Sequence, residues 1–234
     1  MKPQPELEVR TFRQAVEFRA AGSGPGVLAG YAAKYNKLSR NLGGFVEQVL
    51  PGAFDKSLAD GVRVLARYNH ETLLATTDAG SLRLFSDDIG LGYEIDLPDT
   101  TTGRDLAVLA ARGDVRYSSF AFHVMPDGVT WGLTDRDFPL RSLSALGLVD
   151  VAPVDDPAYL DTTSALRSLA DSLLLDFAEV RSAADRNELR DLMRKDVPGI
   201  EPSGDVTPPT PTDPPAEPRM SLDDARLQLA ARAV

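Results

Sequence analysis

The chain has 234 residues, of which 43% are hydrophobic, and a formal net charge of −10. This acidic balance argues against a nucleic-acid-binding protein, because a surface that neutralises phosphates must be basic. Cysteine is absent, which excludes disulfides, thiolate nucleophiles and Cys-ligated metals, and imidazole chemistry is limited to the two histidines, His70 and His123.

No apolar run comes near the roughly 20 residues of a membrane-spanning helix. The first residues, MKPQPELEVRTF, contain no apolar region of the kind found in signal peptides. We therefore expect a cytoplasmic protein. The two histidines are not spaced as metal ligands usually are, and neither a metal nor a cofactor is expected.

Most of the first 163 residues form short segments rich in β-branched and aromatic residues, separated by turn residues, which is typical of strands. The best strand candidates are residues 27–35, 62–68, 82–85, 91–97, 117–125 and 148–154. Two helices are expected, around residues 53–58 and around residues 104–112, the second ending at Gly113 as a C-cap. The sequence thus predicts a sheet-dominated α+β body of six or more short strands, barrel-like or a sandwich, with flanking helices.

Beyond this body, residues 1–163, the composition changes twice. Residues 164–197 have helical periodicity, and residues 198–220 hold eight of the 17 prolines, which predicts a disordered or polyproline linker. Residues 221–234 begin with a capping-box pattern, Ser-Leu-Asp-Asp, and we expect a short helical tail that needs a partner to be stable.

The helical segment carries one apolar seam, whose members are spaced three or four residues apart. They are Leu166, Leu169, Leu173, Phe177, Val180 and Ala184. We interpret the seam as a helix packed on its own body. A contact between copies of the chain, or with a scaffold, is the alternative.

The residues that could act in catalysis lie in the expected strands or directly after them. His70 follows the strand at 62–68, where the pattern changes to a polar turn. Ser118 and Ser119 are consecutive hydroxyls, and because neighbouring strand residues face opposite sides, one can serve the core while the other faces a cleft. Asp150 is a carboxylate inside an apolar run, and a buried carboxylate usually needs a partner.

These residue types suit acyl transfer by a serine, a histidine and an acid, although ordinary structural roles stay open for each. Ser119 and His123 share one face of a strand but lie about 13 Å apart by strand rise, which is too far for a hydrogen bond. We therefore interpret His123 as structural. The acids that could orient a histidine are Asp150, Asp155 and Asp156.

Taken in order, six segments resemble the prohead (capsid maturation) serine protease family of tailed bacteriophages, which is related in fold to the herpesvirus assemblin proteases. They are GYAAKYN at 30–36, GGFVEQVLPGAF at 43–54, RYNHETLLAT around His70, LRLFSDDIGLGYEIDLPDT at 82–100, GDVRYSSFAF at 113–122 and LVDVAPVDDPAY at 148–159. No single segment is decisive, whereas six in one order would rarely arise by chance.

The resemblance implies a role for each of three residues: His70 as the base, Ser119 as the nucleophile and Asp150 as the acid that orients the imidazole. A donor for the oxyanion is also needed, and Arg141, which precedes the last segment, is the candidate side chain. Asp150 stands where the family more often has glutamate, so the backbone would have to make up the reach of about one methylene.

The family's activity implies an endopeptidase that removes scaffold protein, or the scaffold-like arm of the major capsid protein, inside the immature capsid in the host cytoplasm. Such enzymes commonly also cut themselves, for which an exposed proline-rich linker is suited, while the tail would suit docking. Two other interpretations stay open: a non-enzymatic assembly protein with the same fold, and a hydrolase of other specificity that uses the same serine.

Overall fold

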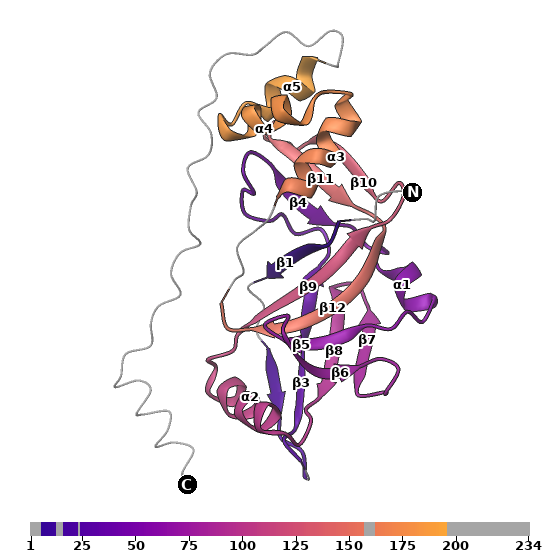
Figure 1. The fold of residues 1–234 in the computed structure, drawn as a ribbon, viewed down its shortest axis with the longest axis vertical. Helices are drawn as coiled ribbons and strands as arrows, with labels where there is room; N and C mark the ends of the chain where they lie inside the picture. The colour runs from indigo at the N-terminus through magenta and orange to yellow at the C-terminus, as the bar shows by residue number, and fades with distance from the viewer. Residues whose placement is uncertain (1–5, 13–15, 23, 157–161, 196–234) are drawn as a thin grey trace, which may run out of the picture. The chain divides into compact units, whose positions relative to one another are not determined.

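The computed structural model describes residues 6–12, 16–22, 24–156 and 162–195 (Figure 1). The chain divides into two units, Met1–Pro198 and Gly199–Val234. The predicted linker at 198–220 and the predicted tail at 221–234 lie outside the described residues. Within the described ranges, no helix combines the length and apolar character needed to cross a membrane.

Three open sheets dominate the part of the chain that the structure describes. The five-stranded sheet has the order β1 (Glu8–Phe12), β9 (Tyr117–Val124), β12 (Leu146–Val154), β5 (Leu65–Tyr68) and β6 (Thr72–Thr76). The four-stranded sheet has the order β2 (Glu17–Arg19), β3 (Val27–Lys34), β8 (Gly90–Asp96) and β7 (Leu82–Ser86). The three-stranded sheet has the order β10 (Val129–Leu133), β11 (Pro139–Leu143) and β4 (Val46–Val49).

The sheet-dominated α+β class is confirmed, but the strands do not close into a barrel. In the five-stranded sheet, β1 and β6 lie at opposite edges, and among the described strands each pairs with a single neighbour. The main core lies between the sheets and is built from fully buried apolar side chains such as Leu28, Tyr93, Ile95, Phe120 and Phe122. The molecule therefore buries its apolar faces by packing sheets together, not by closing one sheet on itself.

The six predicted strands correspond to β3, β5, β7, β8, β9 and β12, with shifts at their ends. Six strands of three to five residues were not predicted, because so short a run gives little periodicity: β1, β2, β4, β6, β10 and β11. The two predicted helices are α1 (Asp55–Ala59) and α2 (Thr101–Arg112). Gly113 caps α2 as predicted, with a φ of 80° that a glycine adopts without strain.

The segment expected as one helix is three: α3 (Thr163–Leu173), α4 (Phe177–Asp185) and α5 (Leu189–Lys195). The apolar periodicity does continue from α3 into α4, but the backbone turns at Leu174, which has a left-handed φ of 52°. The Asp176 side chain then accepts a hydrogen bond from the Ala178 amide at 2.7 Å and starts α4.

The seam of α3 and α4 packs on the chain's own sheets. Leu169 and Val180 are fully buried in a second apolar cluster that includes Phe45, and Trp131 packs against the same cluster. Trp131 Nε1 also donates a hydrogen bond to Ser168 Oγ at 3.0 Å. The helical segment thus shares a core with the body, and a contact between copies through Leu166 to Ala184 stays a prediction.

Candidate active site

Three residues that the sequence singled out meet at one place in the fold. Ser119 Oγ lies 2.6 Å from His70 Nε2, and Asp150 Oδ1 lies 2.7 Å from His70 Nδ1. Ser119 is fully buried, and the side chains of His70 and Asp150 are 17% and 8% exposed. An imidazole between a serine hydroxyl and a carboxylate is the arrangement that can take the hydroxyl proton and hold the resulting positive charge.

The two consecutive serines of β9 have separate functions because they face opposite sides of the strand. Ser118 Oγ lies 2.8 Å from the Tyr93 hydroxyl, and both groups are buried in the core. Burial raises the pKa of Tyr93 to about 12, although the hydrogen bond with Ser118 opposes this. Ser118 therefore satisfies a buried phenol, and Ser119 is the serine that meets the imidazole.

A β-bulge in β12 turns Asp150 toward the site. Leu148 pairs with Phe122, whereas Asp150 pairs with Ala121, so one extra residue, Val149, is inserted in β12. Residues that are directly opposite in an antiparallel pair share a face, which places Asp150 on the face of Ala121 and Ser119. Without the bulge, Asp150 would share the core face of Leu148. The shorter acid thus reaches His70 because the backbone brings it there.

His70 is held in a strained loop at the end of β5. Asn69 and His70 have φ values of 53° and 60°, in the left-handed region that costs a residue with a side chain about 1 kcal/mol or more. The loop is tied to the end of β12, since the Asn69 amide donates to the Pro153 carbonyl and the Asp155 amide donates to Asn69 Oδ1, both at 3.2 Å. These bonds hold the loop against the end of β12, and the imidazole of His70 lies beside Ser119 of β9 and Asp150 of β12.

The other acids and the second histidine lie elsewhere. Asp155 accepts a hydrogen bond from the Tyr68 hydroxyl at 2.9 Å, and Asp156 is exposed. His123 Nδ1 lies 3.0 Å from the Glu6 carbonyl, on the exposed side of the molecule. Of the three acids considered from the sequence, the structure places only Asp150 beside His70.

Arg141, the candidate oxyanion donor, is 1% exposed and belongs to a buried charge cluster with Glu8, Arg10 and Glu47. Its Nη1 donates to both carboxylates, to Glu8 Oε2 at 2.7 Å and Glu47 Oε2 at 2.8 Å, and its Nη2 donates to Glu8 Oε1 at 2.8 Å. An oxyanion donor must point at the charge that develops on the substrate. The terminal nitrogens of Arg141 point at the carboxylates of the cluster. Its role as oxyanion donor therefore stays a prediction.

One strand beside the nucleophile was not predicted from the sequence. Strand β1 pairs with β9, and its Thr11 lies directly opposite Ser119. Thr11 Oγ1 donates to Ser119 Oγ at 3.1 Å, and Ser119 Oγ donates to the Arg10 carbonyl at 3.0 Å. The alternation of Glu8 and Arg10 with Val9 and Thr11 was the available signal, but five residues are too few to distinguish an edge strand from a polar terminus.

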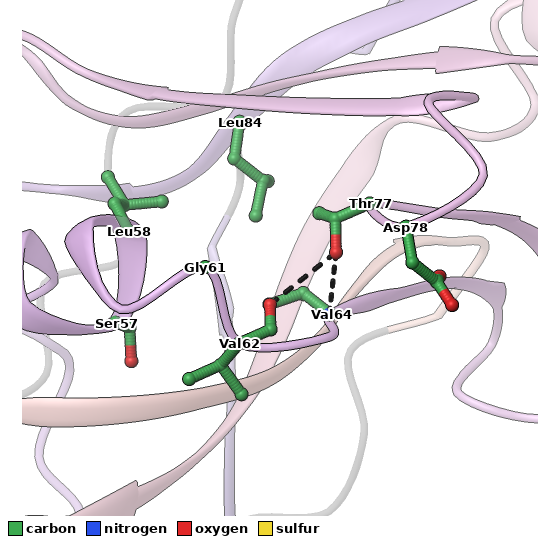
Figure 2. Close-up of a pocket in the computed structure, with 8 residues that line it drawn as sticks. All are labelled: Ser57, Leu58, Gly61, Val62, Val64, Thr77, Asp78 and Leu84. Carbon is green, nitrogen blue, oxygen red and sulfur yellow. Dashed lines mark hydrogen bonds between the residues drawn. The ribbon is translucent and has the colours of Figure 1, made fainter.

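A cavity of about 270 Å³ lies apart from these residues (Figure 2). It is lined by Ser57, Leu58, Gly61, Val62, Val64, Thr77, Asp78 and Leu84. The Thr77 hydroxyl is engaged with the Val64 amide and the Val62 carbonyl (Figure 2). The Asp78 carboxylate is paired with Arg63. Among the residues that the structure describes, no three metal-ligating side chains are gathered in one place.

The chain is similar to known proteins over the region that contains His70, Ser119 and Asp150. A family model described as caudovirus prohead serine protease matches residues 14–173. Among solved structures, this chain is similar to the bacteriophage T4 capsid assembly protease, gp21, with 12% identity and a TM-score of 0.46, over 66% of this chain and 100% of that chain. No curated protein matches the chain.

Proposed function

Because this chain belongs to the caudovirus prohead serine protease family, we propose that it is the endopeptidase that matures a phage head from inside the prohead. Its substrates in this proposal are the scaffold protein or the scaffold-like arm of the major capsid protein. The observation that carries the proposal is the chain of short contacts from Asp150 through His70 to Ser119, at 2.7 and 2.6 Å.

In the mechanism we propose, Ser119 Oγ attacks the peptide carbonyl while His70 Nε2 takes its proton. Asp150 accepts a hydrogen bond from His70 Nδ1, which fixes the tautomer with a free Nε2 and stabilises the imidazolium that forms. His70 then returns the proton to the leaving amine, and water releases the acyl group by the reverse sequence. Backbone amides would stabilise the oxyanion in this proposal. Arg141 is the side-chain candidate from the sequence, but its terminal nitrogens hold Glu8 and Glu47.

The proposal includes two functions for the C-terminal residues. Self-cleavage is assigned to the proline-rich segment at 198–220, because proline-rich chains are extended and lack the backbone pairing that protects folded segments. Docking in the prohead is assigned to residues 221–234. Incorporation into proheads should fall when residues 199–234 are deleted, and unchanged incorporation would remove the docking function from the proposal.

The test of the activity is co-expression with the cognate capsid protein. Ser119→Ala and His70→Ala should each lower the rate of capsid-protein cleavage by at least about 10³-fold, because the two groups act as one unit. His123→Ala is the matched control and should process capsid protein at the normal rate. Asp150→Asn should lower the rate while the fold is kept, since the amide favours the wrong tautomer of His70.

The assembly-protein alternative predicts a different result. A non-enzymatic protein would leave the capsid protein uncleaved with the unaltered chain, while prohead assembly would still depend on it. Normal processing by Ser119→Ala would contradict the protease mechanism. Mass spectrometry of the capsid protein, with a melting curve for each variant, distinguishes a lost activity from a lost fold.

A further inference from the structure

Strand β1 lies along the edge of β9 where a substrate would have to bind. The five residues Glu8–Phe12 pair antiparallel with residues 118–122 of β9, and β12 occupies the other edge of β9 (Figure 1). Ser119 is 0% exposed, and its hydroxyl contacts Thr11 and the Arg10 carbonyl of β1. A peptide from another protein therefore reaches the serine only if β1 leaves.

The contact between β1 and the nucleophile resembles that of a bound peptide. Extended peptides commonly bind enzymes and receptors by adding a strand to a free sheet edge. The Arg10 carbonyl oxygen accepts a hydrogen bond from Ser119 Oγ at 3.0 Å, so the backbone of β1 contacts the nucleophile directly. Yet a serine hydroxyl has one proton, and a bond to the Arg10 carbonyl takes that proton away from His70. Strand β1 therefore occupies the site and also competes with the base.

The strand also lies outside the part of the chain that the family model matches. The family match spans residues 14–173, and β1 ends at Phe12. In a substrate-binding edge of this kind, backbone pairing supplies affinity and alternate side chains supply specificity. The alternate side chains of β1 that point away from Ser119 are Glu8, Arg10 and Phe12, and the two charged ones are both 3% exposed.

Glu8 and Arg10 form ion pairs with two charged side chains from other strands. Arg141 on β11 donates twice to the Glu8 carboxylate, at 2.7 and 2.8 Å. Glu47 on β4 accepts twice from the Arg10 guanidinium, at 2.8 and 3.1 Å. If β1 leaves, Arg141 and Glu47 keep only each other among these partners. An incoming peptide that supplies a carboxylate and a guanidinium at the same spacing restores the contacts that Glu8 and Arg10 made, and it is therefore favoured.

We propose that the edge of β9 opposite β12 is the substrate-binding edge, that β1 occupies it as the chain's own N-terminal segment, and that Arg141 and Glu47 select extended peptides of the pattern Glu-x-Arg. The inference rests on the proposed protease function and adds its substrate class and its built-in competitor. The arginine of such a peptide takes the place of Arg10, whose carbonyl faces Ser119.

The test measures peptide binding by fluorescence anisotropy on the full chain. The probe is a labelled peptide of residues 6–12, ELEVRTF, and the control peptide ELRVETF has the same composition with the second glutamate and the arginine exchanged. The variant Glu8→Gln with Arg10→Gln removes the ion pairs that bind β1 to Arg141 and Glu47. The matched control Glu17→Gln with Arg19→Gln removes the same charges from an exposed pair at the same spacing on β2.

The double variant in β1 should bind ELEVRTF at least about tenfold more tightly than the unaltered chain does, because a tethered strand competes at an effective concentration on the order of mM. It should bind ELRVETF at least about tenfold more weakly than ELEVRTF, because the exchanged charges meet like charges. The control variant in β2 should behave as the unaltered chain. If the double variant does not melt cooperatively, Arg10→Gln alone serves in the same comparison.

Equal binding of the two peptides, or no binding of either by a folded variant, would overturn the inference. Binding needs no catalysis, so the result is independent of the capsid-protein assay. Capsid processing without selective binding would remove this inference and keep the protease. Selective binding without Ser119-dependent processing would keep the peptide-binding edge and remove the protease mechanism.

Discussion

Two strands of this protein carry the pattern Glu-x-Arg in opposite surroundings. In β1, Glu8 and Arg10 are each 3% exposed and are bound to Arg141 and Glu47. In β2, the side chains of Glu17 and Arg19 are 64% and 51% exposed and lie 3.0 Å apart. The local sequence chemistry is the same, so the difference between the two pairs comes entirely from what packs against each strand.

Burial changes how much an ion pair contributes to the stability of the fold. An exposed pair gains little, since water and salt screen it and two long side chains lose freedom. A buried pair has lost its water, so each charge depends on its protein partners and the removal of one partner is costly. The buried charge cluster of β1, β4 and β11 therefore fixes the position of β1 beside Ser119. The exposed pair contributes far less to the position of β2.

The largest effect is expected from removing Arg141. Arg141→Met leaves Glu8 and Glu47 buried with only Arg10 to balance them, and the free energy of unfolding should fall by about 3 to 5 kcal/mol. Arg83→Met, which breaks an exposed pair with Asp96, is the control and should have a much smaller effect. Denaturant unfolding measures both. Equal losses of stability in the two variants would mean that burial does not increase the contribution of these ion pairs.

A smaller, pH-dependent effect is expected from Glu8. Burial alone would raise the pKa of Glu8, but the hydrogen bonds and charges of Arg141 and Arg10 outweigh it and hold the pKa below its ordinary value of 4.5. The ionised carboxylate thus stabilises the fold above about pH 4.5, and this contribution is lost as the pH falls through the lowered value. Arg10, Arg141 and Glu47 are the charged groups that face it.

The difference in unfolding free energy between the unaltered chain and Glu8→Gln should therefore be constant near neutral pH and shrink as the pH falls below about 4.5. Comparing the two proteins cancels the titration of the other carboxylates. A difference that does not change with pH would show that Glu8 has no lowered pKa in the folded state.

The smallest effect is expected on β2. Glu17→Gln with Arg19→Gln removes an ion pair that water already screens, so the melting temperature should hardly change. Any change should disappear at about 1 M salt, where the screening length is about 3 Å. The same salt series should leave most of the Arg141→Met effect in place, because salt does not enter the buried cluster. A large, salt-independent effect in β2 would contradict the comparison.

The chain order of turns and apolar segments was enough to predict six strands, α2 with its Gly113 cap, and the sheet-dominated class. These features depend on contacts between neighbours in the chain, whose periodicity is written in the sequence. The residues His70, Ser119 and Asp150 were named through the resemblance of six ordered segments, and the distances among them came from the fold.

The tertiary structure alone decided three features of the molecule, two of them at the site. The bulge at Val149 turns Asp150 toward His70, and a bulge is defined only by the register against another strand. The backbone turn at Leu174 divides one apolar seam between two helices. The placement of β1 over Ser119 depends on Arg141 and Glu47, which are far from it in sequence. Pairing between distant segments is not periodic, so the sequence predicted the longer strands and the chemistry of the three residues, and the fold determined which segments meet at the serine.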